Sequence, residues 1–356
     1  MTFREIDRYL QYRQHLLTSN PRVCVVRSPN TATMEHVLIG KDTTLNLRMG
    51  ITFPDDPAPE EVLPTSAKEG QSLIDQVIAA TGPKAHPRLA QIMPSLVRHL
   101  HEFAREVNLT VPEWMAAVDM LNECGQMSND RRNETQLLCD ILGLESLVDE
   151  ITSNMLASSN AGTPSAVLGP FYRHDAPLLP NGCSIIKNLT SATPWYSQAI
   201  ADSAYITGRV LSTDGKPIAG AIVDTWLAAP NGLYEQQDDS QTDMNLRGRF
   251  ETDRDGRFAF YALRPTSYPV PFDGPAGRFL TLLDRDANRP GHIHFIVSAP
   301  QHRALTTQLF DDRDKYLTED AVFAVKDELV VKFSPREGDP KARWYLEYDF
   351  VLGREN

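Results

Sequence analysis

The chain has little cysteine and no signal-like beginning. Its four cysteines are widely spaced and form no CxxC pair, so we interpret each thiol as buried and inert rather than as part of a disulfide framework. Residues 1–7 lack the apolar core of a secretory signal. These absences favour a reduced, intracellular protein, which we expect in the cytoplasm.

Long apolar runs and basic charge are also missing. No stretch approaches the ~20 apolar residues of a membrane-spanning helix. The net charge of -12 and an isoelectric point near 5.2 argue against nucleic acid or an anionic membrane surface as a partner, because both attract basic patches. The phosphate-binding patterns GxGxxG, GxxxxGKS and GxxxxGKT are absent, so nothing indicates a nucleotide enzyme.

Changes in composition divide the 356 residues into three regions. Residues 1–65 are an N-terminal extension of unknown role, and they include the acidic, proline-rich stretch 54–61, which is typical of an exposed linker. Residues 66–160 are predicted to be a helical domain and residues 161–356 a strand-rich domain. A hydrophobic share of 41% with 23% charged residues is ordinary for globular proteins.

Apolar residues recur at helical spacing through the second region. Thr110-Val-Pro-Glu113 has the pattern of a capping box, in which the hydroxyl and the carboxylate satisfy two backbone N–H groups at the start of a helix. We interpret the apolar stripes as core or subunit packing rather than as a cofactor site. The expected helices cover residues 73–78, 89–103, 114–121 and 134–156.

Short alternating runs separated by turn signals follow from about residue 165. The expected strands include residues 206–211, 221–226, 258–263 and 329–333, and together they favour a β-sandwich. The strand and turn pattern from Gly208 to Trp226 also resembles transthyretin-like, prealbumin-type sandwiches that bind or scaffold without catalysis. A non-catalytic small-molecule binding module is therefore a second hypothesis, and the site must decide between them.

Two histidines lie two residues apart in Arg289-Pro-Gly-His292-Ile-His294. The segment is β-branched and aromatic, and residues i and i+2 of a strand point to one face with their Cα atoms about 6.6 Å apart, so both rings can reach one ion. His99 and His101 have the same spacing but lie in a helical pattern, where about 200° separates them. The alternative for His292 and His294 is a hydrogen-bonded pair without a metal.

Tyr234 and Tyr268 lie in glycine- and proline-rich turns upstream of these histidines. Keeping a phenol ionised at neutral pH needs roughly 4 kcal/mol, which a hard and highly charged cation can supply. Zinc and ferrous sites use other ligand sets, so two Tyr with two His favour ferric iron. Taken singly, Tyr234 could instead be a turn aromatic, and Tyr268 a ring stacked on Pro269.

Several segments together resemble the intradiol ring-cleavage dioxygenases. The resemblance extends over about residues 70–350, and within the family it is greatest to the hydroxyquinol 1,2-dioxygenases, with catechol and chlorocatechol 1,2-dioxygenases close. It rests on Val167-Leu-Gly-Pro-Phe-Tyr-Arg173, Asp224-Thr-Trp226, Gly232-Leu-Tyr234, Arg247-Gly-Arg-Phe250, Pro265-Thr-Ser-Tyr268-Pro-Val-Pro271, Asp273-Gly-Pro275 and Arg289-Pro-Gly-His-Ile-His294.

The resemblance implies a mainly β fold: a C-terminal β-sandwich of the intradiol dioxygenase type with an N-terminal helical linker domain that joins two subunits and can hold a phospholipid. It implies one Fe(III) per subunit, bound by Tyr234, Tyr268, His292 and His294. Tyr268 would also accept a proton from the substrate and leave the iron. Arg289 would face the substrate with Gln308 beside it, although these two could equally be a surface ion pair and a strand-edge amide.

The implied reaction is cleavage of a catechol-type diol by O2 in aromatic-compound catabolism. We expect hydroxyquinol (benzene-1,2,4-triol) to give 3-hydroxy-cis,cis-muconate or maleylacetate; the alternative is catechol or chlorocatechol giving cis,cis-muconate. Asp149 is expected to accept a hydrogen bond from the third ring hydroxyl, unless it is a solvated helix carboxylate. The expected substrate-binding residues are Ser146, Asp149, Leu168, Gly169, Pro170, Phe171, Val270 and Pro271.

Overall fold

The computed structural model describes residues 67–156 and 162–355. The expected N-terminal extension, residues 1–65, therefore lies outside the described residues. The described residues fall into two compact units, one up to Glu123 and one from Cys124 onward. The division lies inside a helix, and the later helices belong to the same unit as the strands. The domain boundaries expected from the sequence stay predictions.

The first unit consists of α2 (Ala67–Ala79), α3 (Pro87–Glu106) and most of α4 (Val111–Met127). The expected capping box is present, because Glu113 Oε2 accepts from the Thr110 backbone N–H at 2.7 Å and the Glu113 N–H donates to Thr110 Oγ1 at 3.5 Å. Of the helices in the described residues, none combines the length and the apolar character needed to cross a membrane.

Apolar side chains lie exposed along the helices of this first unit. An amphipathic helix normally buries such a stripe against another element. Here the large exposed side chains are Leu73, Val77, Leu89, Ile92, Leu96, Leu100, Phe103, Val107, Val111, Trp114, Met115 and Leu121. The apolar stripes predicted from the sequence are thus helical as expected, but the unit itself does not cover them.

The second unit begins with the end of α4, followed by α5 (Glu134–Ile141) and α6 (Leu144–Leu156). The sequence predicted one helix over 134–156, and this was wrong because the chain turns at Gly143, whose φ of +70° no right-handed helix contains. The break lets α5 bury one side, which packs against α8 (Pro275–Leu282).

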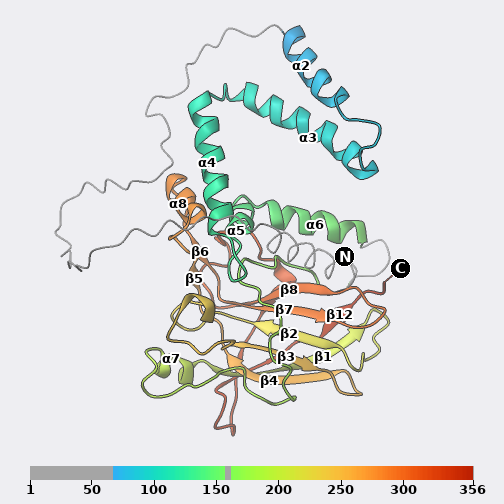
Figure 1. The fold of residues 1–356 in the computed structure, drawn as a ribbon. Coiled ribbons are helices and arrows are strands. Elements are labelled where there is room, and N and C mark those ends of the chain that lie inside the picture. Colours follow the sequence, from blue (N-terminus) through green and yellow to red (C-terminus); the bar gives the residue numbers. More distant parts are fainter. Residues whose placement is uncertain (1–66, 157–161, 356) are drawn as a thin grey trace, which may run out of the picture. The chain divides into compact units, whose positions relative to one another are not determined.

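Two mixed five-stranded sheets form the rest of this unit (Figure 1). The first contains, in spatial order, β3 (Arg247–Glu251), β2 (Ile222–Trp226), β7 (His292–Ser298), β8 (Leu305–Asp311) and β9 (Val330–Val331). The second contains β10 (Ser334–Pro335), β11 (Trp344–Glu347), β1 (Ser203–Ser212) and β12 (Phe350–Leu352), with β4 (Arg257–Leu263) paired to β1. The short α7 (Tyr196–Ala201) precedes β1. Only Val330 and Val331 of the expected 329–333 strand are extended and paired.

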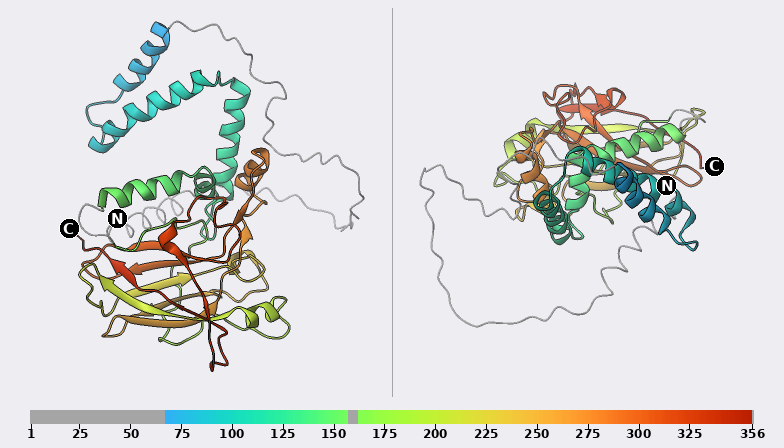
Figure 2. Two further views of the ribbon diagram at one scale, coloured as in Figure 1. Left: turned by 180° about the vertical axis from the view of Figure 1, so that it is seen from behind. Right: turned by 90° about the horizontal axis from the view of Figure 1, so that it is seen from above.

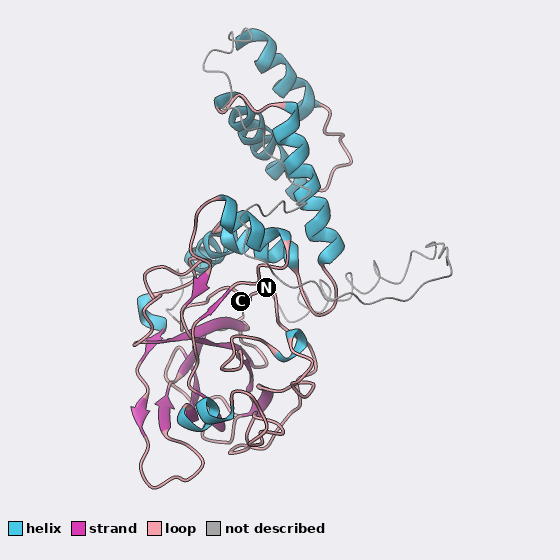
Figure 3. Ribbon diagram, turned by 90° about the vertical axis from the view of Figure 1, so that its left-hand side faces the viewer, coloured by secondary structure: helices cyan, strands magenta, loops and turns pink. Residues whose placement is uncertain are grey.

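The two sheets pack face to face, as the views in Figures 1 and 2 agree. Their core is aromatic: the ring of Phe295 on β7 lies 6.5 Å from that of Phe260 on β4 and 4.9 Å from that of Phe350 on β12. These three side chains are fully buried. The expected β-sandwich with preceding helices is therefore confirmed. Figure 3 shows the long loops that connect its strands. The candidate site combines residues of such loops with residues of β7, the middle strand of the first sheet.

Candidate metal centre and substrate cavity

Three neighbouring strands bring site residues into one row. In the pairing of β2, β7 and β8, His294 lies opposite Trp226 on one side and opposite Gln308 on the other. His292 and His294 are both buried at 2% exposure, and their Nε2 atoms are 3.1 Å apart. The predicted strand geometry of this histidine pair is therefore confirmed. The indole of Trp226 stacks on the His294 ring with centroids 4.7 Å apart, which fixes the plane of the imidazole.

The two tyrosines come from outside the sheets. A two-stranded ribbon of β5 (Tyr268–Pro269) and β6 (Asn288–Arg289) places Tyr268 directly opposite Arg289. Tyr234 follows a turn in which Gly232 has φ +80°. A Cβ at position 232 would lie 2.9 Å from the Tyr268 Cβ, so glycine is what lets the two tyrosine segments approach.

Four possible ligand atoms meet at one point. The Tyr234 hydroxyl lies 2.8 Å from the Tyr268 hydroxyl and 3.0 Å from His294 Nε2, and the Tyr268 hydroxyl lies 3.3 Å from His292 Nε2. Donors bound about 2.1 Å from one ion lie about 3.0–3.4 Å apart at right or tetrahedral angles, so these spacings suit a single metal. The described residues contain no group of three His, Cys, Asp or Glu side chains that could hold a metal instead.

Hydrogen bonding sets the histidine tautomer. His292 Nδ1 donates to the Pro290 carbonyl at 2.7 Å, which leaves the Nε2 lone pair directed at the tyrosines. Burial, together with the nearby Arg289 guanidinium, lowers the pKa of His292 to about 3. Burial and the His292 ring also hold the pKa of His294 well below its ordinary value. Both imidazoles are therefore neutral at physiological pH, which is the form that binds metals.

Unlike the two imidazoles, the two phenols have raised pKa values, which hold them in the un-ionised form. Burial raises the pKa of Tyr234 well above its ordinary value, and the adjoining Tyr268 adds to the effect. Burial also raises the pKa of Tyr268, against the lowering effect of Arg289. Neither phenol ionises at neutral pH with only protein around it, so a cation at the meeting point must supply the stabilisation that phenolate ligands require.

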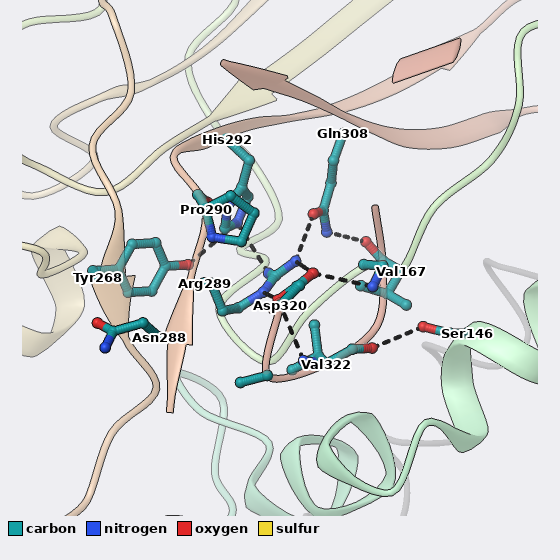
Figure 4. A network of polar contacts seen from close by, with 12 residues as sticks. Ser146, Val167, Tyr268, Asn288, Arg289, Pro290, His292, Gln308, Asp320 and Val322 are labelled. Atoms are coloured by element: carbon teal, nitrogen blue, oxygen red, sulfur yellow. Dashed lines mark hydrogen bonds and ion pairs between the residues drawn. The ribbon is translucent and has the colours of Figure 1, made fainter. Parts of the chain in front are cut away.

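Arg289 is a buried cation at the edge of this cluster (Figure 4). Its Nε donates to Asp320 Oδ1 at 2.9 Å, and its NH2 donates to Gln308 Oε1 at 2.9 Å. Burial lowers the pKa of the guanidinium, but the Asp320 ion pair outweighs it and the net pKa is raised. The remaining donor, NH1, lies 3.0 Å from His292 Nε2. The surface ion pair considered from the sequence is thus a buried one.

Gln308 lies behind Arg289 rather than beside the open space. Its Oε1 accepts from Arg289, and its Nε2 donates to the Val167 carbonyl at 2.6 Å. The side chain is fully buried and is not among the residues that line the cavity. Gln308 therefore lies beside Arg289, where its amide holds the guanidinium and the adjoining wall.

A narrow cavity opens on the tyrosines, Arg289 and His294. Of the expected substrate-binding residues, five line it, while Leu168 packs against the aromatic cluster around Tyr234. The wall can come close to the histidine because Gly169 has φ +77° and a Cβ there would lie 3.2 Å from His294 Cε1. The lining residues are Leu137, Asp140, Gly169, Pro170, Phe171, Tyr234, Tyr268, Val270, Pro271, Arg289, His294 and Val322.

The structure places Ser146 and Asp149 outside this cavity, in contrast to the expectation. The Ser146 hydroxyl donates to the Val322 carbonyl at 2.9 Å, so it supports a wall residue from behind. Asp149 accepts from Lys326 Nζ at 2.7 Å, and both residues line a separate hollow. An ion-paired carboxylate outside the cavity cannot accept a hydrogen bond from the third ring hydroxyl of a substrate bound inside it.

A different carboxyl lines the cavity. Asp140 on α5 is 1% exposed, and burial together with a hydrogen bond to Glu145 raises its pKa well above the ordinary value. The sequence does hold a signal for it: Asp140 lies between Leu137, Leu138 and Ile141 on the buried side of a short helix, where an unpaired carboxylate is rare. Asp320 and Trp226 were also missed, because their partners are remote in sequence.

A network of charged residues also packs around Tyr234 and the turn that carries it. Glu235 is buried, and its Oε2 accepts from Arg247 Nε at 2.7 Å while its Oε1 accepts from Arg173 NH1 at 2.7 Å. The Arg247 guanidinium lies over the Tyr234 ring, 5.7 Å from its centroid. This network fixes the turn that carries Tyr234 and explains why the Arg247 segment appeared among the distinctive parts of the sequence.

Comparison with known proteins agrees with this arrangement. The family model "Catechol dioxygenase N terminus" matches residues 86–160, and the model "Dioxygenase" matches residues 172–354. A catechol 1,2-dioxygenase of Candida albicans is 42% identical over 80% of this chain and 93% of its own length. A hydroxyquinol 1,2-dioxygenase of a Rhizobium species is 40% identical over 79% of this chain and 94% of its own length.

Solved structures give the same result. The hydroxyquinol 1,2-dioxygenase of Pseudomonas putida superposes with a TM-score of 0.68 at 39% identity, covering 81% of this chain and 99% of that one. The catechol 1,2-dioxygenase of Acinetobacter radioresistens superposes with a TM-score of 0.69 at 30% identity, covering 81% and 93%. On these matches, together with the fold and the arrangement of its tyrosines and histidines, the chain belongs to the intradiol ring-cleavage dioxygenases.

Proposed function

We propose that this enzyme cleaves hydroxyquinol with O2 between its two adjacent ring hydroxyls, at one Fe(III) per subunit bound by Tyr234, Tyr268, His292 and His294. The observation that carries the proposal is the convergence of these side chains, each donor atom within 3.3 Å of two others, next to a cavity that a buried carboxyl also lines. Two neutral imidazoles and two phenols make a donor set suited to a hard trivalent ion.

The iron, when bound, supplies Lewis acidity that lowers the pKa values of a chelating diol and makes its ring reactive toward O2. The chain supplies a proton acceptor. The phenol of Tyr268 lines both the cavity and the wider hollow next to it, which shares the wall of Phe171, Val270 and Pro271. We assign Tyr268, as the phenolate that a bound ion would stabilise, to accept one diol proton, because its side chain lines both spaces.

Arg289 supplies fixed positive charge next to the ring. Its ion pair with Asp320 and its bond to Gln308 hold the guanidinium in place before substrate arrives. A metal on His292 Nε2 leaves the Arg289 NH1 donor without its present acceptor and free for an anionic oxygen of the substrate. We therefore assign Arg289 to stabilise negative charge that develops during cleavage, and Gln308 to position it.

The choice of diol rests on Asp140. The sequence identities to hydroxyquinol and catechol enzymes are nearly equal, so they do not separate the two substrates. Asp140 is the one acidic residue among those lining the cavity. Its hydrogen bond to Glu145 leaves a second carboxyl oxygen that can accept from a third ring hydroxyl. A pocket built for such a bond disfavours analogues that lack the hydroxyl.

Substrate choice is tested by the ratio of kcat/KM for hydroxyquinol to that for catechol. Asp140→Asn keeps an acceptor oxygen and an N–H for Glu145, so the preference for hydroxyquinol is expected to survive. Asp140→Leu removes the acceptor and is expected to lower the ratio by about tenfold, the worth of one hydrogen bond. A ratio unchanged in Asp140→Leu, or a wild type that prefers catechol, contradicts hydroxyquinol as the substrate.

The metal assignment is tested by colour. Tyrosinate-to-Fe(III) charge transfer is expected to make the iron-loaded protein wine-red, with a band that moves when a diol is added. Tyr234→Phe and Tyr268→Phe are each expected to change this band. Tyr205→Phe, which alters a tyrosine that packs against Tyr261 in the other sheet, is expected to leave it unaltered. A colourless protein that binds aromatics without turnover would support the carrier alternative.

Assembly belongs to the same proposal. We assign the exposed apolar side chains of α2, α3 and α4 to a homodimer interface, because the helices of this unit do not cover them. A phospholipid is the other occupant that such side chains suit, and lipid extraction with mass spectrometry distinguishes it from a dry protein interface. No disulfide joins the described cysteines Cys124, Cys139 and Cys183 to one another, which is consistent with the proposed cytoplasmic location.

A further inference from the structure

We propose that Glu145 is a positioning residue for substrate choice: it holds Asp140 as a neutral carboxylic acid and ties that acid to the cavity wall through the Leu168 backbone. This inference deepens the proposed function and rests on it for the identity of the substrate. It concerns Glu145, which lies behind the cavity wall, rather than Asp140, which lines the cavity.

Glu145 is anchored by two N–H donors. Its Oε1 accepts from the backbone N–H of Leu168 at 2.8 Å, and its Oε2 accepts from Gln136 Nε2 at 2.9 Å. Leu168 begins the wall that continues through Gly169 to Phe171. One carboxylate therefore connects α5, the start of α6 and the cavity wall, and each of its oxygens already accepts one hydrogen bond.

The same carboxylate is hydrogen-bonded to Asp140. Two carboxyl groups can bond in this way only when a proton lies between them. Glu145 accepts from two N–H groups, whereas Asp140 is almost fully buried, so the proton belongs to Asp140. Asp140 then donates to Glu145 and presents its other oxygen to the cavity as an uncharged acceptor.

An uncharged acceptor matters because a chelated diol is itself negatively charged. A carboxylate in the same place would repel every diol, whereas a neutral acid adds selectivity without that penalty. Besides Glu145, the titratable groups that face Asp140 are Cys139 next to it on α5 and Arg289 on β6, while α8, which packs against α5, carries Arg278.

The test combines infrared spectroscopy with kinetics on the iron-loaded protein. The difference spectrum between wild type and Asp140→Asn is expected to contain the C=O stretch of a protonated carboxylic acid at neutral pH. In Glu145→Gln the new amide N–H can donate to Asp140, and the negative charge next to Asp140 is removed. Asp140 is then expected to lose its proton more readily, so that the infrared band disappears about one pH unit or more below the pH at which it disappears in the wild type. The matched control is Glu150→Gln, an exposed position on the same helix, which is expected to leave the titration where it was.

Kinetics supply a second readout. As the band disappears in Glu145→Gln, kcat/KM for catechol is expected to fall, and that for hydroxyquinol to fall less, because its third hydroxyl can bond to the new carboxylate. In Glu145→Gln the ratio of kcat/KM for hydroxyquinol to that for catechol therefore rises with pH. In the double variant Asp140→Asn with Glu145→Gln this ratio stays flat.

Two results overturn the inference: no carboxylic-acid band in wild type, or a band that titrates identically in wild type and Glu145→Gln. Because the wild-type spectrum alone decides the first, the inference stays testable if Glu145→Gln does not fold. If the bands behave as expected but no variant changes the ratio of the two diols, the positioning role holds and the proposed substrate fails.

Discussion

The two units of the molecule distribute charged and apolar side chains between interior and surface in opposite ways. The strand-rich unit buries charge: Arg247 is 1% exposed and Arg289 is 4% exposed. The helical unit up to Glu123 exposes apolar surface: Leu100 is 56% exposed and Trp114 is 53% exposed. Each is the reverse of the usual distribution, in which charged side chains face water and large apolar ones face the interior.

The difference separates what a unit completes alone from what it leaves for a partner. Each buried guanidinium in the strand-rich unit has a carboxylate at hydrogen-bond distance, Glu235 for Arg247 and Asp320 for Arg289. The site is therefore preorganised within one chain. The exposed leucines of the helical unit have no comparable cover, so their role depends on something that binds there.

Breaking a buried ion pair is the most severe test of this difference. Glu235→Ala leaves Arg247 and Arg173 without their shared carboxylate and is expected to reduce the free energy of unfolding by about 3–5 kcal/mol. The control is Asp255→Ala, whose pair with Arg254 is largely exposed, and a change within about 0.5 kcal/mol is expected. Denaturant unfolding measures both, and equal effects would contradict preorganisation by buried charge.

Removing the other buried guanidinium addresses catalysis. Arg289→Ala is expected to keep iron, because the four proposed ligands remain, but to lower kcat by about 100-fold or more, or about 3 kcal/mol of transition-state stabilisation. Iron content and the visible band check that the metal is still bound. The companion variant Gln308→Ala keeps the guanidinium but loosens it, and we expect a smaller loss of kcat. An unaltered rate in Arg289→Ala would refute the assigned role.

The sequence was sufficient for the features that depend on local spacing. The strand at His292–Ser298, the capping box at Thr110 and the helices of the first unit follow from periodicity and turn chemistry, and the structure has them. The convergence of Tyr234 and Tyr268 on the histidines was predicted by resemblance, since the ribbon that aligns Tyr268 with Arg289 has only two residues per strand and leaves no periodic signal.

What the sequence could not give were contacts between remote segments. Asp149 looked suitable because its surroundings in sequence matched, yet Lys326, 177 residues away, pairs with it. Asp140 lies in the cavity because Gly143 ends α5 and lets that short helix turn its buried side inward. Asp320 is 31 residues from Arg289, so no local pattern links them.

The exposed apolar side chains of the helical unit are tested by charge. Leu96→Glu with Leu100→Glu is expected to weaken self-association by about tenfold or more, because each leucine buried in an interface contributes about 1.5–3 kcal/mol. Sedimentation velocity over a range of concentrations measures the dimer. Gln91→Glu on the same helix, at an exposed polar position, is the control. The visible iron band is expected to stay unaltered, and a wild type that is monomeric at all concentrations would contradict the interface.

A buried carboxyl away from the cavity gives the most graded effect, because its contribution to stability changes with pH. Burial raises the pKa of Asp224 on β2 to about 7, and the Tyr172 hydroxyl lies 3.4 Å from it. The native state therefore binds a proton that the unfolded chain has already lost between about pH 4 and 7, so this group lowers stability as pH rises through that range and has no further effect above it. The slope is about 1.4 kcal/mol per pH unit.

Asp224→Asn removes this titration. Relative to wild type, the variant is expected to gain stability steadily from about pH 4 to pH 7 and then to run parallel. Denaturant unfolding at several pH values measures the difference, with Asp253→Asn, an exposed carboxylate in the turn before β4, as the control. A difference that is flat with pH would mean that Asp224 is ionised in the native protein, stabilised by the neighbouring Arg249. The strand-rich unit would then tolerate buried charge even where no close ion pair compensates it.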